Sequence, residues 1–233
     1  MKAAMFATAA VLATASFVAA DSVTMNYVGK GKGRNATIRV DGNRYTVHAG
    51  QLVHEVTARS GSTGPALGQL TTFCVDVTEY VSSQSRVYDV NELTEAPVAQ
   101  GNSGMDQHKA DAIGRLYSFA DGQQYGTSRS FAAAFQIAIW EIVTDLETET
   151  TALSVSNGDF RAWNLNSGTT TFLDTLLGVA VDDDVLINNR VMALTNDGSQ
   201  DQMFEVVVPL PTTGAMAALG LAGAGFVGRR RRA

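Results

Sequence analysis

Two residues of this chain combine chemical reactivity with an unusual position, Cys74 and Gln136. Cys74 is the single cysteine, so it has no partner for an intramolecular disulfide and is expected to be buried, paired between chains or reactive. Gln136 lies within a long apolar run, where a buried amide without hydrogen-bond partners costs about 1–3 kcal/mol. Both side chains therefore need a committed partner. A thiolate is a strong nucleophile, and a carboxamide held against it is an acyl donor.

The segment that must position Gln136 runs from Phe131 to Asp145. It is long enough for about four helical turns. Apolar residues cover nearly its whole circumference, which is typical of a buried helix. Within that helix Gln136 shares one face with Ala133, Trp140 and Val143. We expect the rest of the domain to be arranged around this helix.

Cys74 lies in the segment from Leu70 to Val77, which has the Thr, Phe and Val content of a β-strand. Period-two alternation divides this strand into a polar face and an apolar face. The first carries Thr72, Cys74 and Asp76, and the second carries Phe73, Val75 and Val77. The alternation therefore predicts that Cys74 points away from the core face, beside polar residues.

The remaining patterns place strands before and after a pair of helices, which predicts an α+β fold: an antiparallel β-sheet or sandwich with an inserted buried helical pair. Further strands are expected at 23–28, 36–41, 44–48, 51–58, 86–93, 152–156, 160–163, 191–195 and 203–208, and further helices at 106–119 and 170–179. Hairpin turns are expected at Asp41-Gly42-Asn43 and Asn157-Gly158, a helix cap at Thr127 or Ser128, and a flexible turn at 29–34.

The two ends differ in composition from the domain, which we place at 21–207. Residues 1–20 carry Lys2 and an uncharged apolar run that closes on small residues, as in a secretory signal peptide. Residues 212–228 are free of charge, and as a helix they extend about 25 Å, against about 30 Å for a hydrocarbon core. This pattern predicts a C-terminal transmembrane helix, and the basic tail that follows it predicts a domain outside the membrane.

The charge distribution excludes one class of partner. Lys2 and the four terminal arginines belong to the two ends, whereas all 23 acidic residues lie between Asp21 and Glu205. The domain is therefore strongly acidic and would repel nucleic acid.

Metal and hydrolase chemistry have weak support in the sequence. His48, His54 and His108 lack the short spacings of metal ligands, and the acidic run 182–184 lacks the spaced loop of a calcium site, so we expect no metal and no cofactor. A cysteine hydrolase would need Cys74, His108 and an aspartate to converge. No local motif indicates this, and we expect a protein that is not an enzyme.

Phe73-Cys74 in a strand and Phe135-Gln136-Ile137-Ala138-Ile139-Trp140 in a helix resemble the paired motifs of bacterial surface thioester domains, although that family has Thr where this chain has Phe135. The resemblance implies that Cys74 is the thiol and Gln136 the acyl donor of an internal thioester. Phe73, Ala138 and Trp140 would be supporting positions. An amine of a partner, such as a lysine, would open the thioester to form an isopeptide bond.

The C-terminal segment 208–233 is similar to the PEP-CTERM sorting signal, which combines a short motif, an apolar span and a basic stop. The resemblance implies processing by an exosortase-type enzyme and delivery to the cell surface or extracellular matrix, with initial membrane anchoring. The residues that carry it are Val208, Pro209, Leu210 and Pro211, then Arg229, Arg230, Arg231 and Arg232.

Three hypotheses follow from the sequence. The first is an exported surface or matrix protein that attaches covalently through a thioester between Cys74 and Gln136. The second is a non-covalent structural or binding protein of the exopolysaccharide matrix, in which Gln136 bonds strand backbone and Cys74 is a small core residue. The third is a cysteine hydrolase.

Overall fold

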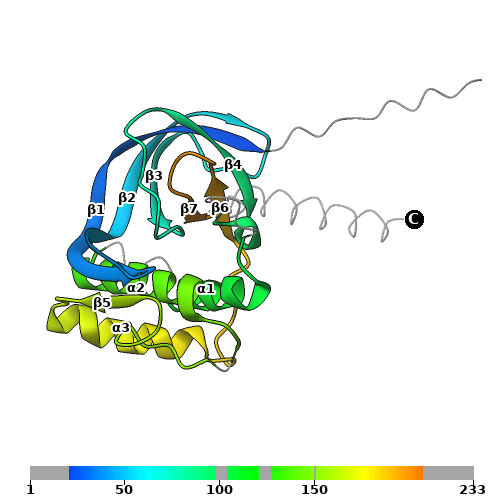
Figure 1. The fold of residues 1–233 in the computed structure, drawn as a ribbon. Helices are drawn as coiled ribbons and strands as arrows, with labels where there is room; N and C mark the ends of the chain where they lie inside the picture. Colours follow the sequence, from blue (N-terminus) through cyan, green and yellow to red (C-terminus); the bar gives the residue numbers. More distant parts are fainter. Residues whose placement is uncertain (1–20, 98–103, 121–126, 150, 207–233) are drawn as a thin grey trace, which may run out of the picture.

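A computed structural model describes residues 21–97, 104–120, 127–149 and 151–206. Within these residues the chain forms one seven-stranded sheet and three α-helices (Figure 1). The elements are β1 (Ser22–Val40), β2 (Asn43–Ser60), β3 (Gly68–Cys74), β4 (Arg86–Glu92), the 3-10 helix η1 (Leu93–Glu95), α1 (Gln107–Ala120), α2 (Arg129–Asp145), β5 (Arg161–Trp163), α3 (Ser167–Ala180), β6 (Val191–Thr195) and β7 (Gln202–Glu205).

The sheet is antiparallel at every pairing and has the order β2-β3-β7-β6-β4-β1-β5. Because β1 pairs with β2 as well as with β4, the sheet also closes on itself, as its strong curvature in Figure 1 shows. The predicted mixture of a large antiparallel sheet and helices is therefore confirmed. The predicted C-terminal transmembrane helix lies outside the described residues. No helix among those described is long and apolar enough to cross a membrane.

β1 and β2 form one long hairpin, where the sequence predicted four short strands. Gly29 to Arg34 was expected to be a flexible turn and is instead extended strand within β1. The register of the hairpin shifts at three places along β1, so bulges absorb the irregular glycine-rich sequence. The expected turn is confirmed: Asp41 and Gly42 both have positive φ, 49° and 78°, as in a two-residue hairpin loop.

Helix α2 has the buried position that its composition predicts. Every residue from Phe131 to Ile142 is buried, and Ser128 caps the helix by accepting a hydrogen bond from the Phe131 N–H. The helix lies between the sheet and α3 (Figure 1). The apolar core between the sheet and the helices includes residues of α2 on its whole circumference. A smaller apolar cluster lies within the closed part of the sheet, around Tyr88 and Phe204.

Two carboxylates near the end of α2 hold the segment that follows. Glu141 Oε1 accepts a hydrogen bond from the Ser154 N–H at 2.7 Å. Asp145 accepts from the N–H groups of Asp159 and Phe160, both at 3.1 Å. Because these contacts fix the segment as turns, the strand predicted at 152–156 is wrong, and only the three residues of β5 extend the sheet there.

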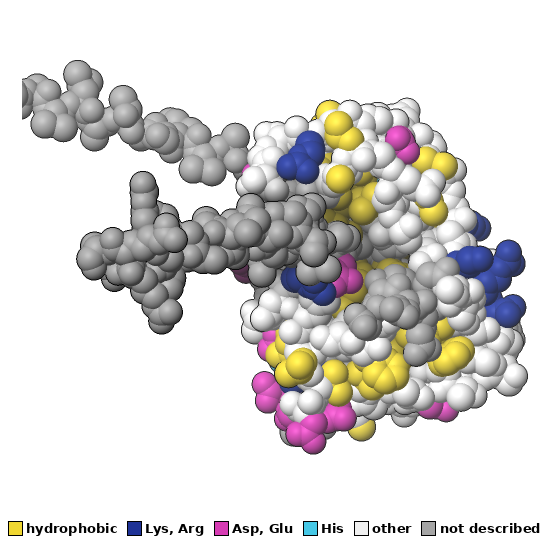
Figure 2. Space-filling model, turned by 180° about the vertical axis from the view of Figure 1, so that it is seen from behind, with side chains coloured by type: hydrophobic (Ala, Val, Ile, Leu, Met, Phe, Trp, Pro, Cys, Tyr) yellow, Lys and Arg dark blue, Asp and Glu magenta, His cyan; other side chains and the backbone are white. Residues whose placement is uncertain are grey.

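The surface displays charged groups of both signs. On the face seen in Figure 2, Lys and Arg side chains gather along one edge, and Asp and Glu side chains gather at a lower corner. Apolar side chains are visible between them. This face therefore presents separate acidic and basic groups.

Candidate functional site

The structure brings Cys74 and Gln136 into contact. The Cys74 N–H donates to Gln136 Oε1 at 2.9 Å, and Gln136 Nε2 donates to the Cys74 carbonyl at 2.8 Å. Cys74 is the last residue of β3, and Gln136 lies in the middle of α2. The carboxamide thus pairs with both backbone groups of the terminal strand residue, as a neighbouring strand would.

The aromatic neighbours of these two residues join β3 to α2. Phe73 and Phe135 precede Cys74 and Gln136 in the chain, and their rings lie 4.9 Å apart at an interplanar angle of 51°. Both side chains are fully buried. Phe135 also contacts the edge of the Tyr117 ring at 5.1 Å, and Ala138 is buried in the same helix. Phe135 therefore fills core volume and holds the helix against the strand.

The thiol lies in a cluster of amides that the sequence did not reveal. Cys74 Sγ donates to Gln200 Oε1 at 2.9 Å. Gln202 Nε2 donates to the backbone carbonyl of Gln200 at 3.1 Å, and Gln202 Oε1 accepts from Thr72 Oγ1 at 2.9 Å. All four side chains are buried. Cys74 lies beside polar groups, as the alternation predicts, but it does not point away from the core: it belongs to the same buried cluster as Phe73 and Val75. The polar groups are buried beside it, where β7 pairs with the end of β3.

Burial raises the pKa of the Cys74 thiol to about 12, opposed by a hydrogen bond with Gln202 and reinforced by the negative charge of Asp76. The sulfur is therefore a thiol at neutral pH. Asp76 is itself buried, and its Oδ2 has no hydrogen-bond partner among the residues that the structure describes. A proton acceptor without a bonded donor thus lies within electrostatic reach of the thiol.

A cavity of about 260 Å³ reaches Cys74. Strands β1 and β2, the segment after β3, and α2 all contribute to its wall. Trp140, one helical turn after Gln136, is 3% exposed, and its Nε1–H has no partner in the described part of the chain. His48 Nε2 also lacks a hydrogen-bond partner among the described residues, and burial lowers the pKa of this imidazole. The cavity therefore has an unpaired donor and an unpaired nitrogen in its wall. Its lining residues include Tyr27, Lys30, Tyr45, His48, Cys74, Glu79, Tyr80, Trp140 and Gln200.

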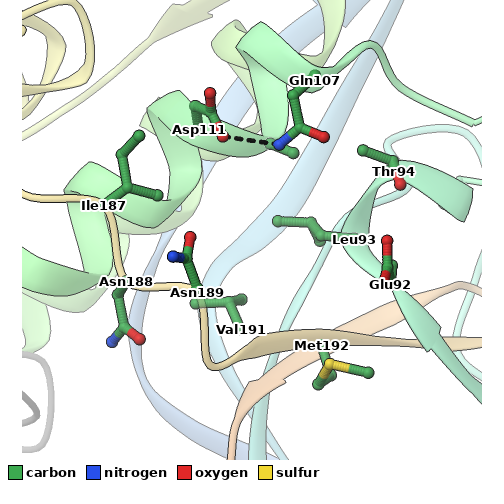
Figure 3. Close-up of a pocket in the computed structure, with 11 residues that line it drawn as sticks. Glu92, Leu93, Thr94, Gln107, Asp111, Ile187, Asn188, Asn189, Val191 and Met192 are labelled. Carbon is green, nitrogen blue, oxygen red and sulfur yellow. Dashed lines mark hydrogen bonds between the residues drawn. The ribbon is translucent and has the colours of Figure 1, made fainter.

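A second cavity, of about 250 Å³, lies between α1, η1 and the segment before β6 (Figure 3). Gln107 Nε2 donates to Asp111 Oδ1 at 2.7 Å on its α1 side. Asn188 and Asn189 come from the opposite segment. Within the described residues, its wall contains none of the buried polar atoms that lack hydrogen-bond partners. The cavity at Cys74 is therefore the better candidate for a binding site.

Among the described residues, no histidine has a hydrogen bond with Cys74. His108 Nε2 bonds to the Leu146 carbonyl at 3.0 Å, and the partner of the thiol is an amide. In the described ranges, no group of three or more His, Cys, Asp or Glu side chains could hold a metal ion.

The comparison with known families decides the nature of the C-terminal segment. Residues 207–232 match the PEP-CTERM protein-sorting motif. The motif covers Val208, Pro209, Leu210 and Pro211 and the four arginines, which lie outside the residues that the structure describes. It marks an exported protein of the cell envelope that an exosortase-type enzyme processes. No curated protein matches the chain, and no solved structure matches it.

Proposed function

We propose that this exported protein attaches covalently to amine-bearing partners of the cell surface or extracellular matrix through an internal thioester between Cys74 and Gln136. The observation that carries the proposal is the double hydrogen bond between the Gln136 carboxamide and the Cys74 backbone, at 2.9 and 2.8 Å. It fixes the acyl carbon beside the residue that carries the thiol. The resemblance to bacterial surface thioester domains supports the same pairing.

The geometry suits acyl transfer because each hydrogen bond has a role in the reaction. The Cys74 N–H donates to Gln136 Oε1, the atom that becomes the oxyanion when sulfur adds to Cδ. The Cys74 carbonyl accepts from Nε2, the nitrogen that leaves. The C–S bond forms, the C–N bond breaks, and the nitrogen departs as ammonia with the thiol proton. Holding the Gln136 carboxamide against the Cys74 backbone lowers the entropic cost of bringing the acyl carbon to the sulfur.

Burial would preserve the product until a partner arrives. Gln136 is fully buried and Cys74 is 5% exposed, so bulk water has little access to the acyl carbon. The cavity at Cys74 gives a route for a slender side chain. A neutral amine that reaches Cδ forms an amide bond, and the sulfur leaves and regains a proton. A lysine of a partner protein fits this reaction, since its amine stands at the end of a long unbranched stem.

One observation favours the non-covalent alternative, a structural or binding protein of the matrix. The Gln136 amide has a bond on both its oxygen and its nitrogen, and the thiol has a bond with Gln200. These polar groups therefore have hydrogen-bond partners without a thioester, and their buried hydrogen bonds can simply link β3 to α2. No contact of Cys74 favours a cysteine hydrolase.

Intact mass of the purified exported protein tests the proposal. The wild type should be lighter than its sequence by one ammonia, and methylamine should then add one molecule. Cys74→Ala and Gln136→Ala should each have the full mass of their own sequence and should not react with methylamine. Gln84→Ala, at an exposed glutamine outside the cavity, is the matched control and should behave as the wild type does. Thiol titration is done after denaturation, since burial limits the access of a reagent to Cys74 in the native state. A wild type of full sequence mass would leave the non-covalent alternative.

A further inference from the structure

Gln200 connects the thiol to the chain segment that follows it. Its Oε1 accepts from Cys74 Sγ at 2.9 Å. Its Nε2 donates to the carbonyls of Asp76 and Glu79, at 2.9 and 2.8 Å. Its backbone N–H donates to the Tyr80 carbonyl at 3.2 Å. One residue thus bonds to the reactive atom and to both ends of the segment 76–80, here called the 76–80 loop.

The 76–80 loop borders the cavity at Cys74. Thr78, Glu79 and Tyr80 all line that cavity, and Tyr80 is 75% exposed. The loop has no strand partner, and its internal bonds run to Asp76 Oδ1 from the N–H groups of Thr78 and Glu79. Gln200 therefore supplies the bonds that tie the loop to the rest of the domain at the side of the cavity.

We propose that Gln200 makes the 76–80 loop respond to the covalent state of Cys74, so that the loop is held in place when the sulfur carries a proton and is released when the sulfur is acylated. This inference rests on the proposed thioester. It assigns Gln200 as a positioning residue that governs access to the cavity, with no bond-making role of its own.

The hydrogen bonds of Gln200 explain why acylation of Cys74 affects the loop. A thioester sulfur has no proton, so Gln200 Oε1 loses the donor that it has in the thiol form. Its remaining side-chain neighbour is Gln202 Nε2, at the longer distance of 3.4 Å. Turning the amide over would point its oxygen at the carbonyls of Asp76 and Glu79, which have nothing to donate. The first arrangement leaves the buried oxygen with one long bond, and the second breaks both side-chain bonds that hold the loop, so acylation favours release of the loop. Opening by an amine restores the S–H and the original set.

Amide hydrogen exchange of a peptide covering 76–82, measured on the exported protein, tests this coupling. Cys74→Ala removes the donor to Gln200, whereas Cys74→Ser keeps one. We expect exchange about tenfold faster in the alanine variant than in the serine variant. In the wild type, the thioester form should exchange faster than the form opened by methylamine. Gln200→Leu should exchange rapidly in every state, and Gln84→Leu, at an exposed glutamine, should leave the pattern unchanged.

The outcomes separate this inference from the proposed function. Neither Cys74 variant forms a thioester, so their comparison decides the coupling even if the wild type keeps its ammonia. Equal exchange in Cys74→Ala and Cys74→Ser would overturn the role of Gln200. A full-mass wild type with unequal exchange in the two variants would overturn the thioester alone and leave the link between the thiol and the loop standing.

Discussion

The rings of Phe73 and Phe135 pack 4.9 Å apart, and each stands one residue before a member of the pair Cys74 and Gln136. This relationship fixes the position of β3 along α2. The amide of Gln136 can meet both backbone groups of Cys74 only if helix and strand keep their separation and register. The packing of the two rings therefore keeps the hydrogen bonds between Cys74 and Gln136 in register.

Removing either ring should destabilise the domain and loosen the site. Phe135→Ala is expected to lower the free energy of unfolding by about 3–5 kcal/mol, because the ring is fully buried. A double-mutant cycle with Phe73→Ala should give a coupling energy of about 0.5–1.5 kcal/mol. Denaturant unfolding of the four proteins measures both quantities. Additive losses would mean that the two rings do not support each other.

Replacing Gln136 by glutamate should make stability depend on pH. The glutamate keeps the shape of the side chain, but an ionised carboxylate would face the Cys74 carbonyl where Nε2 now donates. We expect the folded state to hold this carboxyl protonated, so that its pKa lies above that of the unfolded chain. Stability should then be highest at low pH and fall as the pH rises, by about 1–3 kcal/mol. Thermal unfolding at several pH values, against the wild type, checks this expectation. A variant that unfolds with the wild-type pH profile would contradict the assigned hydrogen bond.

Asp76 is expected to accept the thiol proton during thioester formation. Its Oδ2 is buried without a partner among the described residues, and its charge acts on Cys74. Asp76→Asn keeps an oxygen for the bonds with Thr78 and Glu79 but removes the base. The rate of ammonia loss after refolding, measured by intact mass, should fall by about 100-fold or more. A similar rate in Asp76→Asn and wild type would assign the proton to another acceptor.

Stability of the wild type should fall between mildly acidic and neutral pH because of Glu141. Burial raises the pKa of this carboxyl from 4.5 to about 7, opposed by the bond from the Ser154 N–H and reinforced by Asp145. The folded chain thus binds the proton more tightly than the unfolded chain does. The stabilisation is complete below pH 4.5 and is lost as the pH rises through 7, by about 3 kcal/mol in total. Glu141→Gln should flatten this slope and still accept from Ser154. An unchanged slope in denaturant unfolding would show that other groups govern this pH range.

The basic tail should be needed for correct processing of the sorting motif. Arg229, Arg230, Arg231 and Arg232 close the matched segment, and basic residues remain on the cytoplasmic side of a membrane. Changing all four to serine should leave precursor that retains its C-terminal segment, detected by intact mass of the membrane fraction. Changing all four to lysine keeps the charge and should preserve processing. Equal processing of both variants would mean that charge has no part in recognition.

Sequence reasoning singled out Cys74 and Gln136 as candidates because both residues are chemically out of place, one as a lone thiol and one as an amide in an apolar helix. Local signals were also sufficient for the cap at Ser128 and the turn at Asp41 and Gly42. These features depend on neighbouring residues in the chain, so a local pattern contains the information. The same is true of the burial of α2.

The amide cluster could not be predicted in this way. Gln200 and Gln202 belong to a polar run that precedes a short apolar strand, and such runs usually form exposed turns. They are buried because β7 pairs with β3 and carries them onto the thiol. Likewise, the glycine-rich stretch of β1 is extended because β2 pairs along it with bulges. Partners distant in the chain determine both features, and a local pattern does not contain them.

The placement of β7 has a consequence for the order of events in the cell. Gln200 and Gln202 reach Cys74 only when the last strand of the described domain has paired with β3. A chain in which β7 has not yet paired has none of these contacts. We therefore expect the hydrogen bond between Gln200 and the thiol, and with it the tie to the 76–80 loop, to form only after the last strand has joined the sheet.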